Sequence, residues 1–301
     1  MKFRRGKLRR WAVVPALTLV CLLRPDVVFS QSDQRQLKDI FNLQWLATTR
    51  GRPEQVSELQ AGQLSLTAAT PFFMTTNPQS IPGGSSADMY FSPWVTAEWK
   101  KPLGRDTNWY LGASFADYQY IRFPELNSAF AEVSAGITRT LARGDWLSIS
   151  GYAVAAWDYN MSSAFAADDW EVSLSLGLTI DLDLGHGHSL YFTPDATGLQ
   201  AFPGSASSNS FLSLTPTAGW TWQVTNIITL GAYWSGGISC YPVIGQSDFL
   251  QYIGANADWQ ATPNLSIGLS CIETLASSTN AGSRYTDLSA GISVKFAIPG
   301  Q

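Results

Sequence analysis

The sequence is short of charge and has no long apolar run beyond its first residues. Charged residues make up 14% of the 301 residues, whereas about 25% is usual for soluble domains. No stretch after residue 30 approaches 18 apolar residues in a row, so no transmembrane helix is predicted. The surface is nevertheless too poor in Lys and Glu for a typical soluble protein. A transmembrane β-barrel reconciles these observations, because its strands alternate apolar and polar residues.

Chemically reactive residues are equally scarce. The chain holds 3 cysteines and 2 histidines and no C-x-x-C pair, which excludes a disulfide scaffold. His186 and His188 lie near Asp181 and Asp183 in the sequence. A tetrahedral metal site would need one more ligand, which is not adjacent, and the glycines around the histidines favour a turn. No G-x-S-x-G, H-E-x-x-H or P-loop string occurs. We therefore expect no metal, no cofactor, no catalytic residue and no enzymatic activity.

The first 30 residues have the composition of an export signal. Basic residues precede a largely apolar run over 11–23, and small residues precede the expected cleavage point after Ser30. A lipoprotein signal at Cys21 and a twin-arginine signal at Arg9-Arg10 are the alternatives. Cleavage leaves 12 basic and 22 acidic residues, a net charge of −10. An acidic exported chain argues against nucleic acid and anionic lipid headgroups as partners.

The clearest signal of secondary structure is the segment 170–183. Its even-numbered residues from Val172 to Leu182 are apolar, and the odd-numbered residues between them are small or polar. This period of two predicts a strand with one apolar face. The opposite face is mostly uncharged, which suits a confined aqueous lumen. The same alternation recurs over 287–296, near the end of the chain.

Extending this interpretation predicts twelve strands, joined by connections that alternate between short and long. The strands are expected near 64–75, 89–101, 107–119, 129–141, 146–158, 170–183, 188–196, 209–224, 227–238, 250–260, 264–275 and 285–297. The short connections, rich in Gly, Asn, Asp and Pro as hairpin turns are, lie at 102–106, 142–145, 184–187, 225–226 and 262–264. The long connections lie at 76–88, 120–128, 159–169, 197–208, 239–249 and 276–284. Cys240 and Cys271 would then be separated by a strand, too far apart for a disulfide.

The alternation of short and long connections is typical of an all-β fold, a transmembrane antiparallel up-and-down β-barrel. Tight turns in such barrels face the periplasm, and an even number of strands places both termini there. A signal peptide over 1–30 thus precedes a periplasmic leader over 31–62, the barrel occupies 63–297, and a tail covers 298–301. Apolar residues spaced by three and four favour one short helix in the leader; a frayed, mobile segment is the alternative.

In its export signal, its loop asymmetry and its last strand, the sequence resembles the bacterial outer-membrane β-barrel superfamily over residues 64–297. The last strand, "LSAGISVKF", looks like the family's assembly signal of alternating apolar residues that ends in an aromatic. Here "AIPGQ" follows the aromatic, which departs from the family's pattern. The resemblance implies an outer-membrane location, with membrane lipid and the barrel assembly machinery as partners. The residues of the assembly signal are Leu288, Ile292, Val294 and Phe296.

The strand faces expected to point into the barrel carry more acid than base. The expected pore-lining residues are Glu98, Glu132, Glu171, Asp181, Asp183, Asp258, Asp287 and Lys295. Acid-lined pores favour cations, so the sequence predicts a porin-like channel for passive passage of small hydrophilic solutes, with a mild cation preference. Alternatively, the acids pair with Lys100, Lys295 and Arg139 and side chains fill the barrel. The protein would then be a non-conducting structural or surface-interaction barrel.

Overall fold

A computed structural model describes residues 63–298 except 81, 85, 163–166 and 203–207. The strands are β1 (Gln63–Thr75), β2 (Asp88–Phe91), β3 (Trp94–Pro102), β4 (Thr107–Tyr120), β5 (Ser128–Arg143), β6 (Leu147–Ser162), β7 (Ala167–Gly185), β8 (His188–Phe202), β9 (Phe211–Gln223), β10 (Ile228–Tyr241), β11 (Gln246–Thr262), β12 (Leu265–Ser278) and β13 (Tyr285–Ile298). Two 3₁₀ turns, η1 (Pro124–Leu126) and η3 (Ala281–Ser283), complete the described elements. The predicted signal peptide and helical leader lie outside the described residues.

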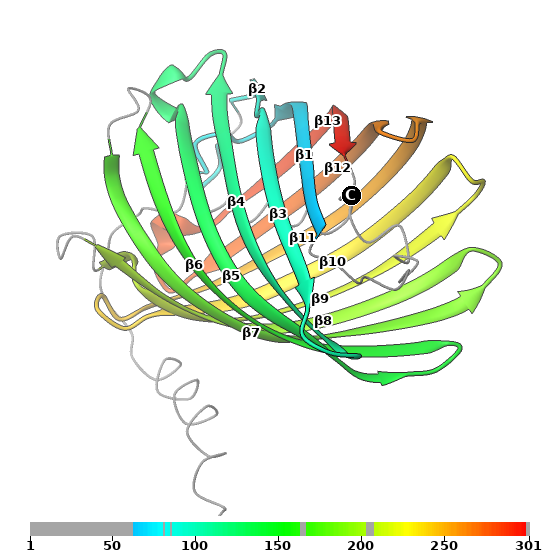
Figure 1. Ribbon diagram of the computed structural model, residues 1–301. Helices are drawn as coiled ribbons and strands as arrows, with labels where there is room; N and C mark the ends of the chain where they lie inside the picture. The colour runs from blue at the N-terminus through cyan, green and yellow to red at the C-terminus, as the bar shows by residue number, and fades with distance from the viewer. Residues whose placement is uncertain (1–62, 81, 85, 163–166, 203–207, 299–301) are drawn as a thin grey trace, which may run out of the picture.

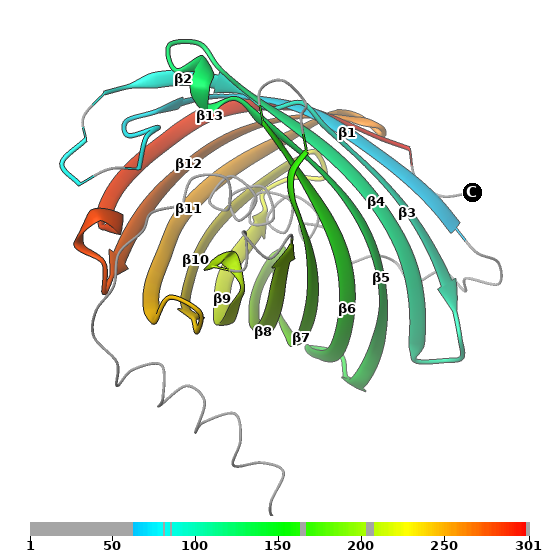
Figure 2. The same cartoon turned by 90° about the vertical axis from the view of Figure 1, so that its left-hand side faces the viewer.

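The strands form one antiparallel sheet that closes on itself, as the prediction of a barrel requires (Figure 1, Figure 2). Sequence neighbours pair around the wall, and β1 pairs with β13 from Leu66 opposite Ile298 to Thr75 opposite Ser289. Because Ile298 belongs to this ladder, the barrel extends one residue beyond the predicted boundary at 297. The closed ladder leaves no free sheet edge, so backbone donors and acceptors of the wall are paired within the wall.

Twelve strands span the wall, and a short extra strand, β2, lies in line with β3. Both β2 and β3 pair with β1 on one side and β4 on the other. The predicted strand at 89–101 is therefore interrupted at Ser92 and Pro93. Proline has no backbone N–H to donate to a ladder, while Ser92 N donates to Pro71 O over 3.0 Å and keeps the register across the break.

The five predicted short turns are confirmed, but the alternation of short and long connections is not as strict as expected. The predicted long connection at 239–249 is wrong, since β10 and β11 continue pairing up to Tyr241 opposite Gln246 and leave only residues 242–245 between them. The strands β6, β7 and β8 likewise run beyond their predicted ends, to 162, from 167 and to 202. Apolar alternation marks the part of a strand that meets apolar surroundings, whereas backbone pairing continues without it.

The two faces of the wall differ as the alternation predicted. Along β7 the even-numbered residues Val172, Leu174 and Leu176 are exposed, with Leu176 at 53%, while the odd-numbered Ser175 faces inward and shares a 2.7 Å hydrogen bond with Thr197. Equivalent inward hydroxyl pairs join β8 to β9 and β9 to β10. The exposed surface is thus apolar and the inward surface polar, which is the arrangement of a barrel in a bilayer.

Inward aromatic residues pack at the end of the barrel that carries the longer loops. A buried cluster joins strands β1 to β5, with Phe73 stacked on Tyr90 at a centroid distance of 5.6 Å. Its buried members are Ala69, Phe73, Tyr90, Trp94, Ala116, Tyr118, Tyr120 and Phe130. One side of the barrel interior is therefore filled by side chains at this end.

A second inward feature repeats around the wall: an aromatic ring covers the glycine directly opposite on the next strand. The pairs are Tyr110 with Gly136, Tyr152 with Gly177, Tyr191 with Gly219, Tyr233 with Gly254 and Phe73 with Gly291. A Cβ atom at any of these glycines would collide with the ring. The rings supply the cross-strand packing that a glycine lacks, and they join the strands in pairs around the barrel.

The cysteine prediction is confirmed. Cys240 lies on β10 and Cys271 on β12, with β11 between them. Neither cysteine is part of a disulfide.

The assignment of faces predicts opposite tolerance of arginine at two adjacent positions. Leu176→Arg puts a charge at the middle of β7 on the outward face, and we expect it to lower the free energy of unfolding by about 2 to 4 kcal/mol if that face meets the bilayer midplane. Ser175→Arg places the same charge on the inward face and should be tolerated. Urea unfolding in lipid vesicles, followed by tryptophan fluorescence, measures both; equal losses would mean that the faces are assigned wrongly.

The ring-over-glycine contact predicts a coupled pair of mutations. Gly219→Val should destabilise the barrel by about 1 to 3 kcal/mol, because the new side chain displaces the Tyr191 ring. Tyr191→Ala removes the obstacle, so the double variant should lose less stability than the sum of the single losses. The same unfolding assay tests this, and strictly additive losses would show that the two residues do not share a site.

Candidate functional site

The inward face of the barrel is the candidate functional surface, and the predicted pore-lining residues all lie on strand positions that face inward. Several of them alternate with exposed apolar neighbours, as Glu132 does with Val133 and Lys295 does with Val294. Their strands are β3 for Glu98, β5 for Glu132, β7 for Glu171, Asp181 and Asp183, β11 for Asp258, and β13 for Asp287 and Lys295. Six of these residues fall into four environments. Asp183 lies at the β7–β8 turn, and Asp181 lies on β7 opposite Ser148 and Tyr191.

The first environment is a row of three carboxylates across neighbouring strands. Glu132 on β5 lies opposite Asp158 on β6, and Asp158 lies opposite Glu171 on β7. Asp158 is 0% exposed and Glu171 4% exposed, whereas Glu132 is half-buried. The sequence interpretation missed Asp158 because it ended the strand there. The alternation of Trp157 and Tyr159 on the outward face would have placed Asp158 inward.

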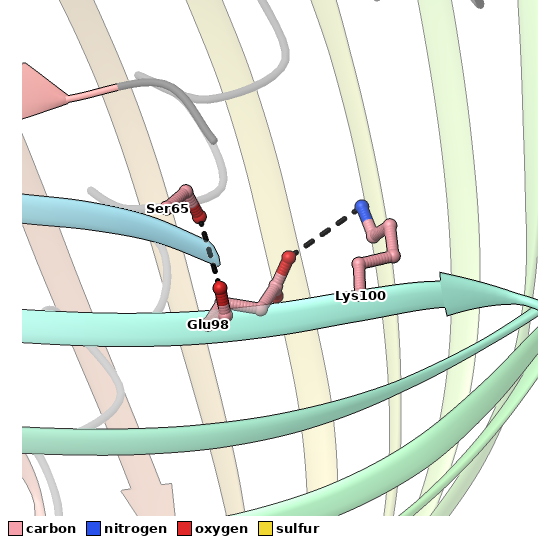
Figure 3. Close-up of polar contacts among 3 residues, drawn as sticks. All are labelled: Ser65, Glu98 and Lys100. Atoms are coloured by element: carbon pink, nitrogen blue, oxygen red, sulfur yellow. Dashed lines mark hydrogen bonds and ion pairs between the residues drawn. The ribbon is translucent and has the colours of Figure 1, made fainter. Parts of the chain in front are cut away.

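The second environment is an ion pair between neighbouring inward residues of β3. Lys100 Nζ lies 3.5 Å from Glu98 Oε1, and both side chains are partly exposed (Figure 3). Ser65 on β1 donates from its hydroxyl to the Glu98 carbonyl oxygen over 3.4 Å. The expected pairing of acids with Lys100 is therefore found here. The expected pairing of acids with Arg139 is not found, because Arg139 is exposed on the outward face of β5.

The third environment joins β11, β12 and β13. Asp258 and Ser293 lie opposite Gly268 from either side, and a Cβ atom at this glycine would meet both of their side chains at 2.8 Å. Asn256 Nδ2 donates to Asp258 Oδ2 over 2.6 Å. Lys295 lies two residues beyond Ser293 on the same inward face. The absent side chain at Gly268 lets Asp258 lean toward the strand that carries Lys295.

The fourth environment is the seam between the first and last strands, where Asp287 has a structural role. Its Oδ1 accepts hydrogen bonds from Thr75 Oγ1 at 2.7 Å, Thr76 N at 2.9 Å and Asn77 N at 2.8 Å. Its Oδ2 accepts one from Ser289 Oγ at 2.9 Å. Asp287 is 9% exposed, so this carboxylate ties the end of β1 to β13 and offers little surface to a passing ion.

Asp183 and the two histidines lie at the tight β7–β8 turn, as the glycines predicted. Asp183 Oδ1 accepts from Gly185 N over 2.8 Å. Gly185, His186 and Gly187 all have positive φ, which a tight hairpin turn requires. His188 stacks on Trp222 at 5.1 Å, and its Nδ1 accepts from Trp220 Nε1 at 3.2 Å. The imidazole is therefore held in an aromatic stack on the outward rim.

Neither metal chemistry nor a helical membrane span is evident in the part of the chain that the structure describes. No group of three or more His, Cys, Asp or Glu side chains there is arranged to hold a metal ion. No described helix is both long and apolar enough to cross a membrane.

Comparison with known proteins gives no match to any family model or curated protein. Solved structures do match. An outer-membrane channel of Pseudomonas putida F1 aligns at 11% identity and a TM-score of 0.53, over 82% of this chain and 99% of that one. The two chains therefore share the fold of a closed antiparallel β-barrel. The DcaP channel of Acinetobacter baumannii aligns at 11% identity over 79% and 97% of the two chains (TM-score 0.46), and the NanC porin at 8% over 76% and 98% (TM-score 0.47).

The seam predicts that Asp287 supports stability and not ion selectivity. Asp287→Ala leaves the donors of Thr75, Thr76 and Asn77 without their acceptor, and we expect it to lower the free energy of unfolding by about 2 to 3 kcal/mol. Ion selectivity of the folded variant, read as the reversal potential across a planar bilayer, should stay unchanged. A shifted reversal potential would return Asp287 to the conduction path.

Proposed function

We propose that this protein is an outer-membrane channel for passive passage of small hydrophilic solutes, with a mild preference for cations. The observation that supports this proposal most directly is the composition of the inward face. Ser, Thr and Gly on that face alternate with exposed apolar residues, and its charged residues are mainly acidic. The fold shared with the Pseudomonas putida channel supports an outer-membrane location. The short-turn end, where both ends of the described barrel lie, would then face the periplasm.

The cation preference follows from the balance of inward charge. Glu98, Glu132, Asp181 and Asp258 are all partly exposed on inward positions of the wall, while the described strands carry Lys100 and Lys295 as inward bases and Arg143 near the rim. Carboxylates around a passage raise the local concentration of cations and lower that of anions. The ion pair of Lys100 with Glu98 reduces this effect on one side, which is why the expected preference is mild.

A second candidate function, a non-conducting structural barrel, is favoured by the buried aromatic cluster and by the burial of Asp158. The ring of Phe73 and its neighbours fills part of the long-loop end, and side chains can close a narrow barrel altogether. Current through single molecules of the refolded chain in a planar bilayer separates the two candidates. Discrete conductance steps support the channel, and absence of steady current from a folded barrel supports the structural candidate.

We also propose that the last strand is the segment that the barrel assembly machinery recognises. The side chains of Leu288, Ile292, Val294 and Phe296 are exposed to a similar degree on one face of β13, from 44% to 46%. They therefore form an unbroken apolar row that a partner strand or groove can read from outside the barrel.

Neutralising inward acids tests the selectivity. The triple variant Glu132→Gln, Glu171→Gln, Asp258→Asn should lower the ratio of cation to anion permeability by about twofold or more without preventing folding. The measurement is the reversal potential under a salt gradient. Glu273→Gln is the matched control, since Glu273 is an exposed acid on the outward face of β12 and should leave the potential unchanged. An unaltered potential in the triple variant would remove these acids from the conduction path.

A further inference from the structure

The outward face of the barrel carries two basic residues close together near the short-turn end of the wall. Lys101 is the second-last residue of β3, and Arg139 lies four residues before the end of β5. Both side chains are exposed. Register places Lys101 opposite Trp109 on β4, Trp109 opposite Ile137 on β5, and Arg139 two residues beyond Ile137.

Neither of these two cations forms an ion pair within the described part of the protein. The other basic residues of the described strands are placed differently: Lys100 and Lys295 face inward, and Arg143 lies opposite the inward Ser148. Charge on the membrane-facing surface of a barrel is unfavourable unless it lies near the interface, where it meets lipid headgroups. The outward strand acids Asp117 and Glu273 lie toward the opposite end of their strands. Asp106, which precedes the Thr107 that pairs with Arg139, lies in an exposed turn at the same end, and the exposed Arg105 beside it adds a positive charge there.

The surroundings of the pair fit a lipid. Trp109 lies between the two cations and packs edge-on against Trp99 at a centroid distance of 4.7 Å. Tryptophan side chains favour the headgroup level of a membrane. Farther from the short-turn end, Leu111, Val133 and Ile137 are exposed and apolar. An amphiphile with a negative head and apolar chains matches both halves of this surface.

We propose that Lys101 and Arg139 bind the phosphate of an anionic phospholipid, whose acyl chains lie on the apolar wall beside Trp109. Strand spacing and rise put the two Cα atoms roughly 12 Å apart, a gap that the two long side chains can close around one phosphate group. The net charge of −10 expected for the exported chain argued against such a partner. The distribution of charge over the faces reverses this expectation, because the acids lie mainly inside the barrel.

Native mass spectrometry of the refolded full chain tests the site. Detergent-solubilised protein is offered phosphatidylglycerol or phosphatidylcholine, and the fraction of barrels that retain a lipid is counted. We expect at least about a threefold preference for phosphatidylglycerol in the wild type, and loss of this preference in the double variant Lys101→Ala, Arg139→Ala. Electrophoresis of unheated samples checks that each variant is folded, because a closed barrel migrates differently from the boiled chain.

The matched control is Lys100→Ala, Arg143→Ala, which removes the same charge from the same two strands but on inward positions. It should retain the preference for phosphatidylglycerol. The proposal is overturned if the wild type retains both lipids equally, if the folded Lys101, Arg139 variant keeps its preference, or if the control loses it. Conductance is a separate measurement, so failure of the lipid site leaves the channel proposal untouched.

Discussion

The structure depends on one constraint: the backbone N–H and C=O groups along every strand of the sheet must find their partners within the protein. A sheet satisfies this constraint only when its edges meet, so the pairing of β1 with β13 completes every other ladder. Asp287 reinforces the place where this seam ends, by accepting hydrogen bonds from the backbone of Thr76 and Asn77 just after β1. Asp287, which the sequence predicted to line the pore, thus helps to hold the two strands of the seam together.

Closure also determines what each side chain can do. Once the wall is closed, the odd and even positions of a strand face two different surroundings. A slip of one residue in register would exchange the two sets of side chains. The tyrosines that cover Gly136, Gly177, Gly219 and Gly254 oppose such a slip, since each ring fits only where the partner strand has no side chain. These inward glycines are therefore places where neighbouring strands are joined.

Sequence reasoning reached the twelve strands that span the wall, the tight turns and the two faces, because each has a local cause, but it did not predict the extra strand β2. Alternation in β7 and the glycines around His186 act within a few residues. Prediction from the sequence failed where the cause is not local. Tyr241 and Gln246 pair beyond the predicted ends of β10 and β11, and hydropathy gave no sign that the two strands continue so far. The inward position of Asp158 likewise depends on a strand that continues past its predicted end. Whether the Arg139 side chain points inward or outward depends likewise on register. It points outward, so the expected ion pair with inward acids is not formed.

The charges show why net charge is a poor guide to the partners of a barrel. A soluble protein presents all its charges to one solvent, so their sum describes the field that a partner meets. A barrel wall divides them, and charges on the two sides are separated by the thickness of the sheet and the side chains that cover it. An acidic inward face and the outward bases Lys101 and Arg139 can therefore coexist, and the proposed channel and the proposed lipid site would face fields of opposite sign from the same chain.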